Sequence, residues 1–227
     1  YDLTIYAAAY YDGLVYATGM HSVGGYYMLT INPSNFTYNI VCETQLQLRA
    51  MAFDYTTGTM YGIGNTESLN GALYQVDLNT METTLVTTND LNTTLVAMAI
   101  DDNGTMYVAD ESGTLYTMDK LSGQLTATGM QGAYSPYLQS MTYDYNNDTI
   151  YWAVGGSLYQ VSTESGEIKS IGYIVRNRRN IDVVNYQSIF MAFIPGWITT
   201  LSGCKVNYTI HSLAEDSPKY GLFMKIL

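Results

Sequence analysis

Aspartates at regular spacing are the first residues of this sequence that could do chemistry. Asp54, Asp101 and Asp144 follow one another at intervals of 47 and 43 residues. Carboxylates that converge inside a channel are the usual machinery of glycoside hydrolysis. These three, however, all stand directly after an apolar run and before residues such as Gly58 or Gly104, where aspartate closes a tight turn with its side chain. The spacing therefore favours turn formation over catalysis.

Histidine and cysteine do not form a recognisable centre. The two histidines, His21 and His211, fall at different places in the pattern described below, and no cysteine or carboxylate stands beside them at metal-ligand spacing. The sequence contains no nucleophile elbow, P-loop or Gly-x-Gly-x-x-Gly motif. We therefore expect no catalytic residue, no metal and no cofactor.

An internal repeat must position every one of these side chains. An aromatic residue in a Thr-Met-Tyr-like motif recurs five times, at Tyr16, Tyr61, Tyr107, Tyr151 and Phe190. Successive copies are 45, 46, 44 and 39 residues apart. A second motif of the Tyr-x-Val-Asp type follows each copy, beginning at Leu29, Tyr74, Tyr116, Tyr159 and Tyr208. Two independent motifs that agree five times in 227 residues indicate five structural units.

Each unit has the pattern of four short strands. The first strand is apolar on both faces, as at 50–53 and 96–100, which predicts a strand buried between neighbours. An Asp turn leads to a second strand with the Tyr motif, a third begins after Gly71, Gly113 or Gly156, and the fourth is the most polar. A sheet that is apolar on both faces cannot stand alone, whereas sheets packed radially bury one another.

We therefore predict an all-β protein, a single β-propeller domain over 1–227 with five blades of four antiparallel strands. The blades are expected at about 1–43, 44–90, 91–132, 133–178 and 179–227. The last copy is the most divergent. Its second strand is expected around Phe190, and its fourth, outermost strand at 220–227.

The repeat also resembles a known class of proteins. The Asp turn followed by Met-Tyr, then Gly-x-Leu-Tyr-x-Val-Asp and Ser-Gly-x-x-Thr, is similar to the repeats of extracellular bacterial β-propellers, with the NHL and quinoprotein-like families nearest. The resemblance covers about residues 1–190 and implies an architecture more than an activity. The tryptophan docking pattern of quinoproteins is absent, so no quinone cofactor is implied.

Charge and hydropathy exclude several partners. Nine Lys and Arg against 20 Asp and Glu give a net charge of −11, which repels nucleic acids and acidic membrane surfaces. The longest apolar stretch, 189–198, is about half the length of a membrane crossing and contains Pro195. Few lysines with much Tyr, Thr, Asn and Gly are usual for secreted bacterial proteins. We expect an extracellular or cell-surface location without membrane insertion.

A ligand site is expected where loops gather at one end of the propeller. The connections from second to third strands and from fourth to first strands meet there, and aromatic rings beside carboxylates and amides suit sugars or peptides. Trp152 joins the set because it interrupts the repeat, where other copies have Ala17, Gly62 and Val108. The candidates are His21, Asn65, Glu67, Asp110, Glu111, Tyr134, Tyr137, Trp152, Arg176, Arg178 and Trp197.

Cys42 and Cys204 are the only cysteines. The first is expected to end the outer strand of blade one and the second to begin the third strand of blade five, and ring closure makes those blades neighbours. A disulfide between them would close about 160 residues and stabilise the ring by roughly 5 kcal/mol on the chain-entropy estimate. Two buried thiols are the alternative.

Two functions follow from the pattern. The first is a non-catalytic binding or adhesion module that recognises glycan or protein, either as a monomer or within a larger surface protein. The second is a carbohydrate-active enzyme, a glycoside hydrolase or lyase, which requires carboxylates from non-equivalent positions inside the channel. Asp182, Asp110 and Glu111 are the carboxylates that suggest it. A purely structural spacer is a third possibility.

Overall fold

The structure is a computed structural model that describes residues 3–21, 24–35, 37–66, 68–131, 139–154, 157–165, 167–173, 189–195 and 220–226. Every regular element in these ranges is a β-strand. In chain order the strands are β1 (Leu3–Tyr11), β2 (Leu14–His21), β3 (Tyr26–Ile31), β4 (Tyr38–Thr44), β5 (Gln47–Asp54), β6 (Thr59–Asn65), β7 (Ala72–Val76), β8 (Thr83–Thr87), β9 (Leu95–Ile100), β10 (Met106–Asp110), β11 (Thr114–Met118), β12 (Leu125–Gln131), β13 (Gln139–Asp144), β14 (Thr149–Val154), β15 (Ser157–Ser162), β16 (Ile168–Tyr173), β17 (Ile189–Pro195) and β18 (Tyr220–Ile226).

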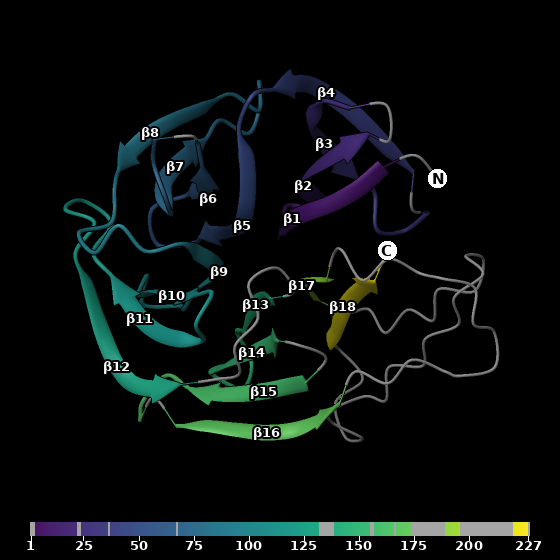
Figure 1. The fold of residues 1–227 in the computed structure, drawn as a ribbon. Coiled ribbons are helices and arrows are strands. Elements are labelled where there is room, and N and C mark those ends of the chain that lie inside the picture. The colour runs from purple at the N-terminus through teal and green to yellow at the C-terminus, as the bar shows by residue number, and fades with distance from the viewer. Residues whose placement is uncertain are drawn as a thin grey trace.

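The strands form five antiparallel sheets around a common centre. β1–β4, β5–β8, β9–β12 and β13–β16 are four-stranded sheets in which each strand pairs with the next along the chain, and β17 pairs with β18. Figure 1 shows β1, β5, β9, β13 and β17 nearest the centre, and β4, β8, β12 and β16 at the rim. This arrangement is a β-propeller with four-stranded antiparallel blades, which confirms the predicted fold class.

The last sheet closes the ring but differs from the prediction in strand order. β17 contacts both β13 and β1, so it takes the innermost place between the fourth blade and the first. The sequence motif had assigned Phe190 to a second strand. The segment 220–227 had been predicted as an outermost strand, whereas β18 pairs directly with β17. Both predictions were wrong. The spacing of the two motifs gives the length of each repeat, but it does not determine which strand a divergent copy pairs with.

The Asp turns are confirmed as structural features. The Asp54 Oδ1 accepts hydrogen bonds from the Thr56 backbone N–H and hydroxyl, at 2.9 and 2.6 Å. The Asp101 Oδ1 accepts the backbone N–H groups of residues 103 and 105, and the Asp144 Oδ1 accepts that of residue 146. Blade one uses a two-residue turn instead, in which Asp12 and Gly13 both have positive φ, at 45° and 83°. That conformation matches the twist of a β-hairpin.

The hydrophobic core lies between blades rather than within them. One cluster joins Ala7, Ala9 and Tyr16 of the first blade to Leu48 and Met51 of the second. Equivalent clusters join the second blade to the third and the third to the fourth. Each sheet therefore buries both of its faces only when a neighbour stands on each side, which is why the repeat folds as a ring.

Candidate functional site

Two hollows lie along the inner strands at the centre of the ring. The inner strands carry small residues such as Ala8, Ala52 and Ala99, which let the blades approach closely. Met51, Met98 and Met141 line two separate hollows, one towards each end of the channel, and are themselves at most 4% exposed. The methionines therefore border both hollows, and each also packs in a core cluster between two blades.

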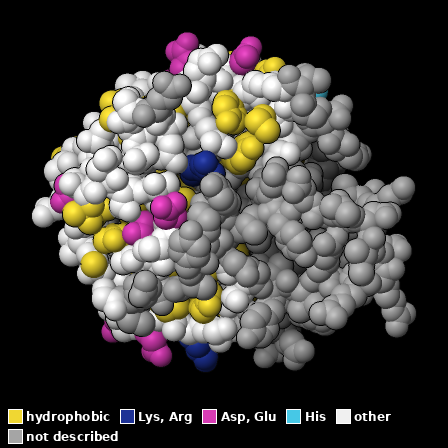
Figure 2. Space-filling view, viewed as in Figure 1, with side chains coloured by type: hydrophobic (Ala, Val, Ile, Leu, Met, Phe, Trp, Pro, Cys, Tyr) yellow, Lys and Arg dark blue, Asp and Glu magenta, His cyan; other side chains and the backbone are white. Residues whose placement is uncertain are grey.

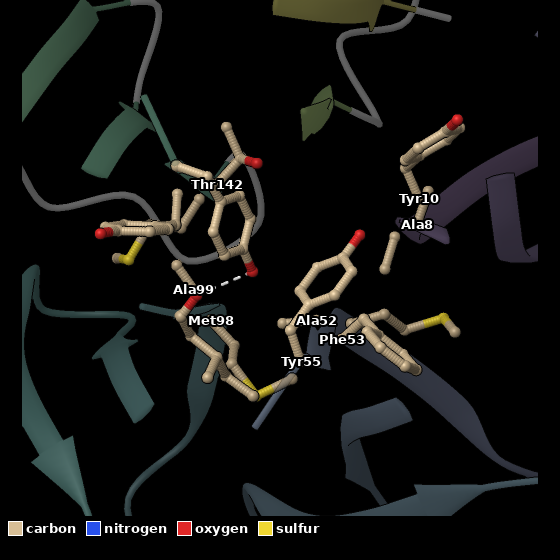
Figure 3. A pocket seen from close by; sticks show the side chains of 14 residues that line it. Ala8, Tyr10, Ala52, Phe53, Tyr55, Met98, Ala99 and Thr142 are labelled. Atoms are coloured by element: carbon tan, nitrogen blue, oxygen red, sulfur yellow. Dashed lines mark hydrogen bonds between the residues drawn. The ribbon is translucent and has the colours of Figure 1, made fainter. Parts of the chain in front are cut away.

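The larger hollow lies at the end that carries the turns between first and second strands. A space of about 40 Å³, open to solvent, is lined by β1, β5, β9, β13 and the turns that follow β5 and β13. Figure 3 shows Tyr10, Phe53, Tyr55 and Thr142 around it, with the dashed bond from the Tyr145 hydroxyl to the Ile100 carbonyl at 3.3 Å. We call this the tyrosine hollow: Tyr10, Phe53, Tyr55, Tyr143 and Tyr145 above the three methionines.

The rings of the tyrosine hollow contact one another across blades. Tyr55 packs edge-to-face against Tyr145, with centroids 5.0 Å apart and planes at 80°. Phe53 meets Tyr55 at 76°, and Tyr143 meets Tyr145 at 89°. Tyr55 nevertheless keeps 48% of its surface exposed, whereas Phe53 and Tyr143 are buried. The second and fourth blades thus build a single aromatic wall in which Tyr55 is the ring most open to solvent.

Negative charge surrounds this aromatic wall. Burial raises the pKa of Tyr145, and the nearby Tyr55 and the carboxylates of Asp54, Asp101 and Asp102 raise it further. Burial also raises the pKa of Tyr55, with smaller contributions from neighbouring tyrosines and Asp12. Both phenols therefore stay neutral at physiological pH and remain hydrogen-bond donors. The hollow offers aromatic faces, hydroxyls and a negative potential, which suits binding more than covalent chemistry.

The carboxylate and amide candidates that the structure describes at the opposite, loop-bearing end mostly close their own loops. The Asn65 Oδ1 accepts the Gly71 backbone N–H at 2.6 Å. The Asp110 Oδ1 accepts the backbone N–H groups of Ser112 and Thr114 and the Ser112 hydroxyl. Asp110 is only 5% exposed, whereas Glu111 lies exposed in the same turn. Asn65 and Asp110 thus hold the conformation of these loops, and their oxygens are already engaged in doing so.

His21 and Cys42 both belong to blade one. His21 ends β2 and its ring lies 6.4 Å from that of Tyr27, edge to face. Cys42 is half-buried near the end of β4, the outer strand, as predicted. Burial raises the pKa of its thiol, with a smaller contribution from Glu82. Neither residue touches the tyrosine hollow.

Trp152 lies inside the protein rather than on a binding surface. Its side chain is 0% exposed, within the cluster between blades three and four. The indole Nε1–H donates to the Gln139 Oε1 at 3.0 Å, and the Gln139 Nε2 donates to the Asp110 carbonyl at 3.0 Å. Trp152 therefore departs from the repeat because it fills space and anchors a glutamine that links two blades. We leave it out of the proposed site.

This role makes a prediction about stability. Replacing Trp152 with phenylalanine is expected to cost about 2–3 kcal/mol, because it removes buried ring surface and leaves the buried Gln139 carbonyl without its donor. Urea unfolding followed by circular dichroism measures the loss. Trp152→Phe with unchanged stability would contradict the described packing.

The remaining candidates lie outside the described residues. They are Glu67, Tyr134, Tyr137, Arg176, Arg178 and Trp197, together with Cys204 and Asp182. The Cys42–Cys204 bridge and the loop-end set therefore stay predictions.

Sequence reasoning missed the tyrosine hollow. Tyr55 and Tyr145 each follow the turn aspartate directly, in Asp54-Tyr55 and Asp144-Tyr145. A large ring at the second position of a solvent-facing turn is unusual, and this was the available signal. Tyr55 belongs to the second blade and Tyr145 to the fourth, so no local sequence pattern could indicate that the two rings are in contact.

On the face shown in Figure 2, the described hydrophobic side chains do not form one broad, flat patch. On this face the described hydrophobic and acidic side chains gather in small, separate groups, with one Lys or Arg near the middle. Among the described residues, no three His, Cys, Asp or Glu side chains come close enough to hold a metal ion. The tyrosine hollow is thus the most distinctive feature for ligand binding in the described part of the chain.

Comparison with known proteins places the fold. No family model matches this sequence, and no curated protein matches it. Among solved structures, a structural genomics protein of unknown function from Bacteroides thetaiotaomicron is similar with a TM-score of 0.55 and 15% identity, covering 75% of this chain and 44% of its own. An auxiliary nutrient binding protein from Bacteroides ovatus is similar with a TM-score of 0.52 and 15% identity, covering 73% of this chain and 40% of its own. TolB from Acinetobacter baumannii is similar with a TM-score of 0.52 and 14% identity, covering 75% of this chain and 44% of its own.

These matches confirm a β-propeller. At 14–15% identity they show the fold alone, and the resemblance to NHL and quinoprotein-like repeats stays a prediction. This chain spans less than half of the length of each of the three proteins.

Proposed function

We propose that the protein is a non-catalytic binding module whose ligand enters the tyrosine hollow. The observation that carries this proposal is the convergence of aromatic side chains from separate blades on one solvent-open space, with Tyr55 half-exposed at its edge. Ligand sites in proteins are concave, mostly apolar and provided with a few placed polar groups. The hollow is concave and presents polar and apolar surface in similar amounts, with phenol hydroxyls and the Thr142 side chain among its polar groups.

The state of the nearby carboxylates supports binding over catalysis. Glycoside hydrolysis uses a pair of carboxyl groups that face the substrate. Asp54, Asp101 and Asp144 are each at most 5% exposed, and their oxygens accept the hydrogen bonds that close their own turns. Asp110, which suggested the hydrolase or lyase alternative, is engaged in the same way at the other end of the channel.

The proposed ligand is a glycan or a protein, and the proposed location is the outside of a bacterial cell. One solved neighbour is described as an auxiliary nutrient binding protein, and the neighbours are longer than this chain, which supports a module within a larger surface protein. No helix in the described part of the chain is long and apolar enough to span a membrane.

Replacing Tyr55 with alanine tests the proposal. We expect wild-type protein to bind members of a glycan array or a peptide array, and Tyr55→Ala to lose at least about tenfold in affinity, because a half-exposed ring at the edge of the hollow supplies contact area. Biolayer interferometry on the positive array members measures the change.

Tyr38→Ala is the matched control. Tyr38 is 53% exposed on β4, the outer strand of blade one, and does not line the hollow. Its replacement is expected to leave binding unchanged. The proposal fails if Tyr55→Ala binds as wild type does, and release of sugar products in mass spectra would favour the enzyme instead.

A further inference from the structure

We infer that the group bound in the tyrosine hollow is a lysine or arginine side chain of a partner protein. This inference rests on the proposed function and names the ligand chemistry of the same site. It depends on the angles between the aromatic rings, the sign of the charge around them, and the extent of that charge beyond the hollow.

The ring geometry favours a compact cation over a flat sugar ring. A sugar stacks best on one broad, open aromatic face. Here the contacts from Phe53 to Tyr55, from Tyr55 to Tyr145 and from Tyr145 to Tyr143 are all near-perpendicular, at 76°, 80° and 89°. The rings of the aromatic wall therefore lie in more than one plane. An ammonium or guanidinium group that approaches from solvent can meet the electron-rich face of the half-exposed Tyr55 ring.

The charges of the described residues around the hollow are mostly negative. The turns between first and second strands in blades one to four carry six aspartates and no Lys or Arg, and the aspartates are Asp12, Asp54, Asp101, Asp102, Asp144 and Asp148. No Lys or Arg is among the described residues that line the hollow. Lys120 is the cation that reaches these turns in the described part of the chain, and it is bound to Asp54. The field therefore attracts cations and repels carboxylates and phosphates.

Hydrogen bonds keep part of this charge ionised in mild acid. The Thr163 hydroxyl and the Tyr143 phenol donate to Asp148 and lower its pKa. The Ser122 backbone N–H and hydroxyl and the Leu121 N–H lower the pKa of Asp119, in the neighbouring hairpin between β11 and β12. The negative field is therefore present over the whole physiological pH range.

The acidic rim is wider than the hollow, which favours a protein over a small amine. Asp12, Asp102 and Asp148 are exposed in three different blades. Asp77 and Asp119 are exposed in hairpins between third and fourth strands, which the antiparallel strand order brings to the same end. A small amine meets only the hollow, whereas a basic protein surface places one side chain in the hollow and others against the rim.

Binding of short synthetic peptides tests the inference. The probes are acetyl-Gly-Lys-Gly-Lys-Gly-amide, the same peptide with norleucine for both lysines, the same peptide with glutamate, and choline as a small cation. We expect isothermal titration calorimetry to give the lysine peptide at least about tenfold tighter binding than the norleucine peptide, because norleucine keeps the side-chain carbons without the charge. The glutamate peptide should not bind, and 0.5 M NaCl should weaken the lysine peptide several-fold.

Variants separate the aromatic and ionic parts. Tyr55→Ala should lose most of the affinity for the lysine peptide, while Tyr55→Phe should stay within about twofold, because the ring face is kept. Asp12→Asn and Asp102→Asn remove exposed rim charges and should each weaken binding about twofold to threefold. Glu43→Gln, on the outer strand β4, is the matched control and should have no effect. Circular dichroism confirms that each variant is folded.

The outcomes distinguish this inference from the proposed function. Equal affinity for the lysine and norleucine peptides, tighter binding of choline than of the lysine peptide, or no binding of the lysine peptide at millimolar concentration overturns the cationic protein ligand. The binding module still stands if a neutral glycan binds and Tyr55→Ala removes that binding. Both proposals fail if neither peptides nor glycans lose affinity on Tyr55→Ala.

Discussion

Gly123→Ala is expected to destabilise the protein by about 3 kcal/mol or more, through a clash between two blades. Gly123 lies in the hairpin between β11 and β12 with φ at 75°. A Cβ added there would clash with the carbonyl oxygen of Thr88, which follows β8 of the preceding blade. Since both sides of this contact are backbone, the hairpin has to move, and alanine pays the additional strain of a left-handed conformation.

That movement would break identified bonds. The Asp90 N–H donates to the Gly123 carbonyl at 3.2 Å, and the Leu125 N–H donates to the Asp90 Oδ1 at 2.9 Å. These bonds hold blade three against the connection that leaves blade two. Urea unfolding at pH 7, monitored by circular dichroism, measures the free-energy loss.

Gly58→Ala is the matched control. Gly58 has a similar φ of 67°, but a Cβ there meets no atom within 4 Å. It is therefore expected to lose only about 1 kcal/mol, the conformational part alone. Equal losses for the two variants would show that backbone conformation, and not the contact between blades, makes Gly123 necessary.

Lys120→Met is expected to lower the free energy of unfolding by about 3 kcal/mol at pH 7, because it leaves a buried carboxylate without its cation. The Lys120 ammonium forms an ion pair with Asp54, whose side chain is 0% exposed, and also donates to the Gly104 carbonyl at 2.7 Å. The lysine thus joins the hairpin of blade three to the turn of blade two. Removing one partner of a buried ion pair destabilises a protein by more than the pair's net contribution to stability, because the remaining charge stays desolvated.

The pH dependence of this loss has a definite sign. Burial raises the pKa of Asp54, but hydrogen bonds from Lys120, Thr56 and Thr57 outweigh it, so that the pKa is lowered overall. A lowered folded-state pKa stabilises the protein above the unfolded value of about 4, and this contribution is lost as the pH falls through the folded value. Without Lys120 the pKa of Asp54 is expected to rise, because burial still opposes the charged form and one of the bonds that lower the pKa is lost.

The deficit of Lys120→Met should therefore shrink as the pH is lowered from 7 to 4, when Asp54 of the variant becomes neutral. Unfolding free energies of the two proteins at both pH values measure it. Lys169→Met, an exposed lysine on β16, is the control and should change stability by less than about 0.5 kcal/mol. A deficit that is absent, or the same at pH 4 as at pH 7, would contradict the buried pair.

The architecture of this protein could be predicted from its residues alone. Apolar first strands such as 96–100 can be buried only between neighbours, and a motif spacing near 45 residues determines the size of the unit that supplies them. The Asp54, Asp101 and Asp144 turns were predictable because an Asp turn depends on residues two to four positions away. Local chemistry therefore sufficed for the blades, their strand order up to β16 and their packing in a ring.

The tertiary structure alone decided which side chains meet. Lys120 and Asp54 are 66 residues apart, Tyr55 and Tyr145 are 90 apart, and Trp152 reaches Gln139 inside an interface that two blades share. In a repeat protein the same motif positions recur in every blade. The motif therefore does not tell which residue of which blade a given side chain contacts. The packing of the blades around the ring selects the partners, and with them the tyrosine hollow.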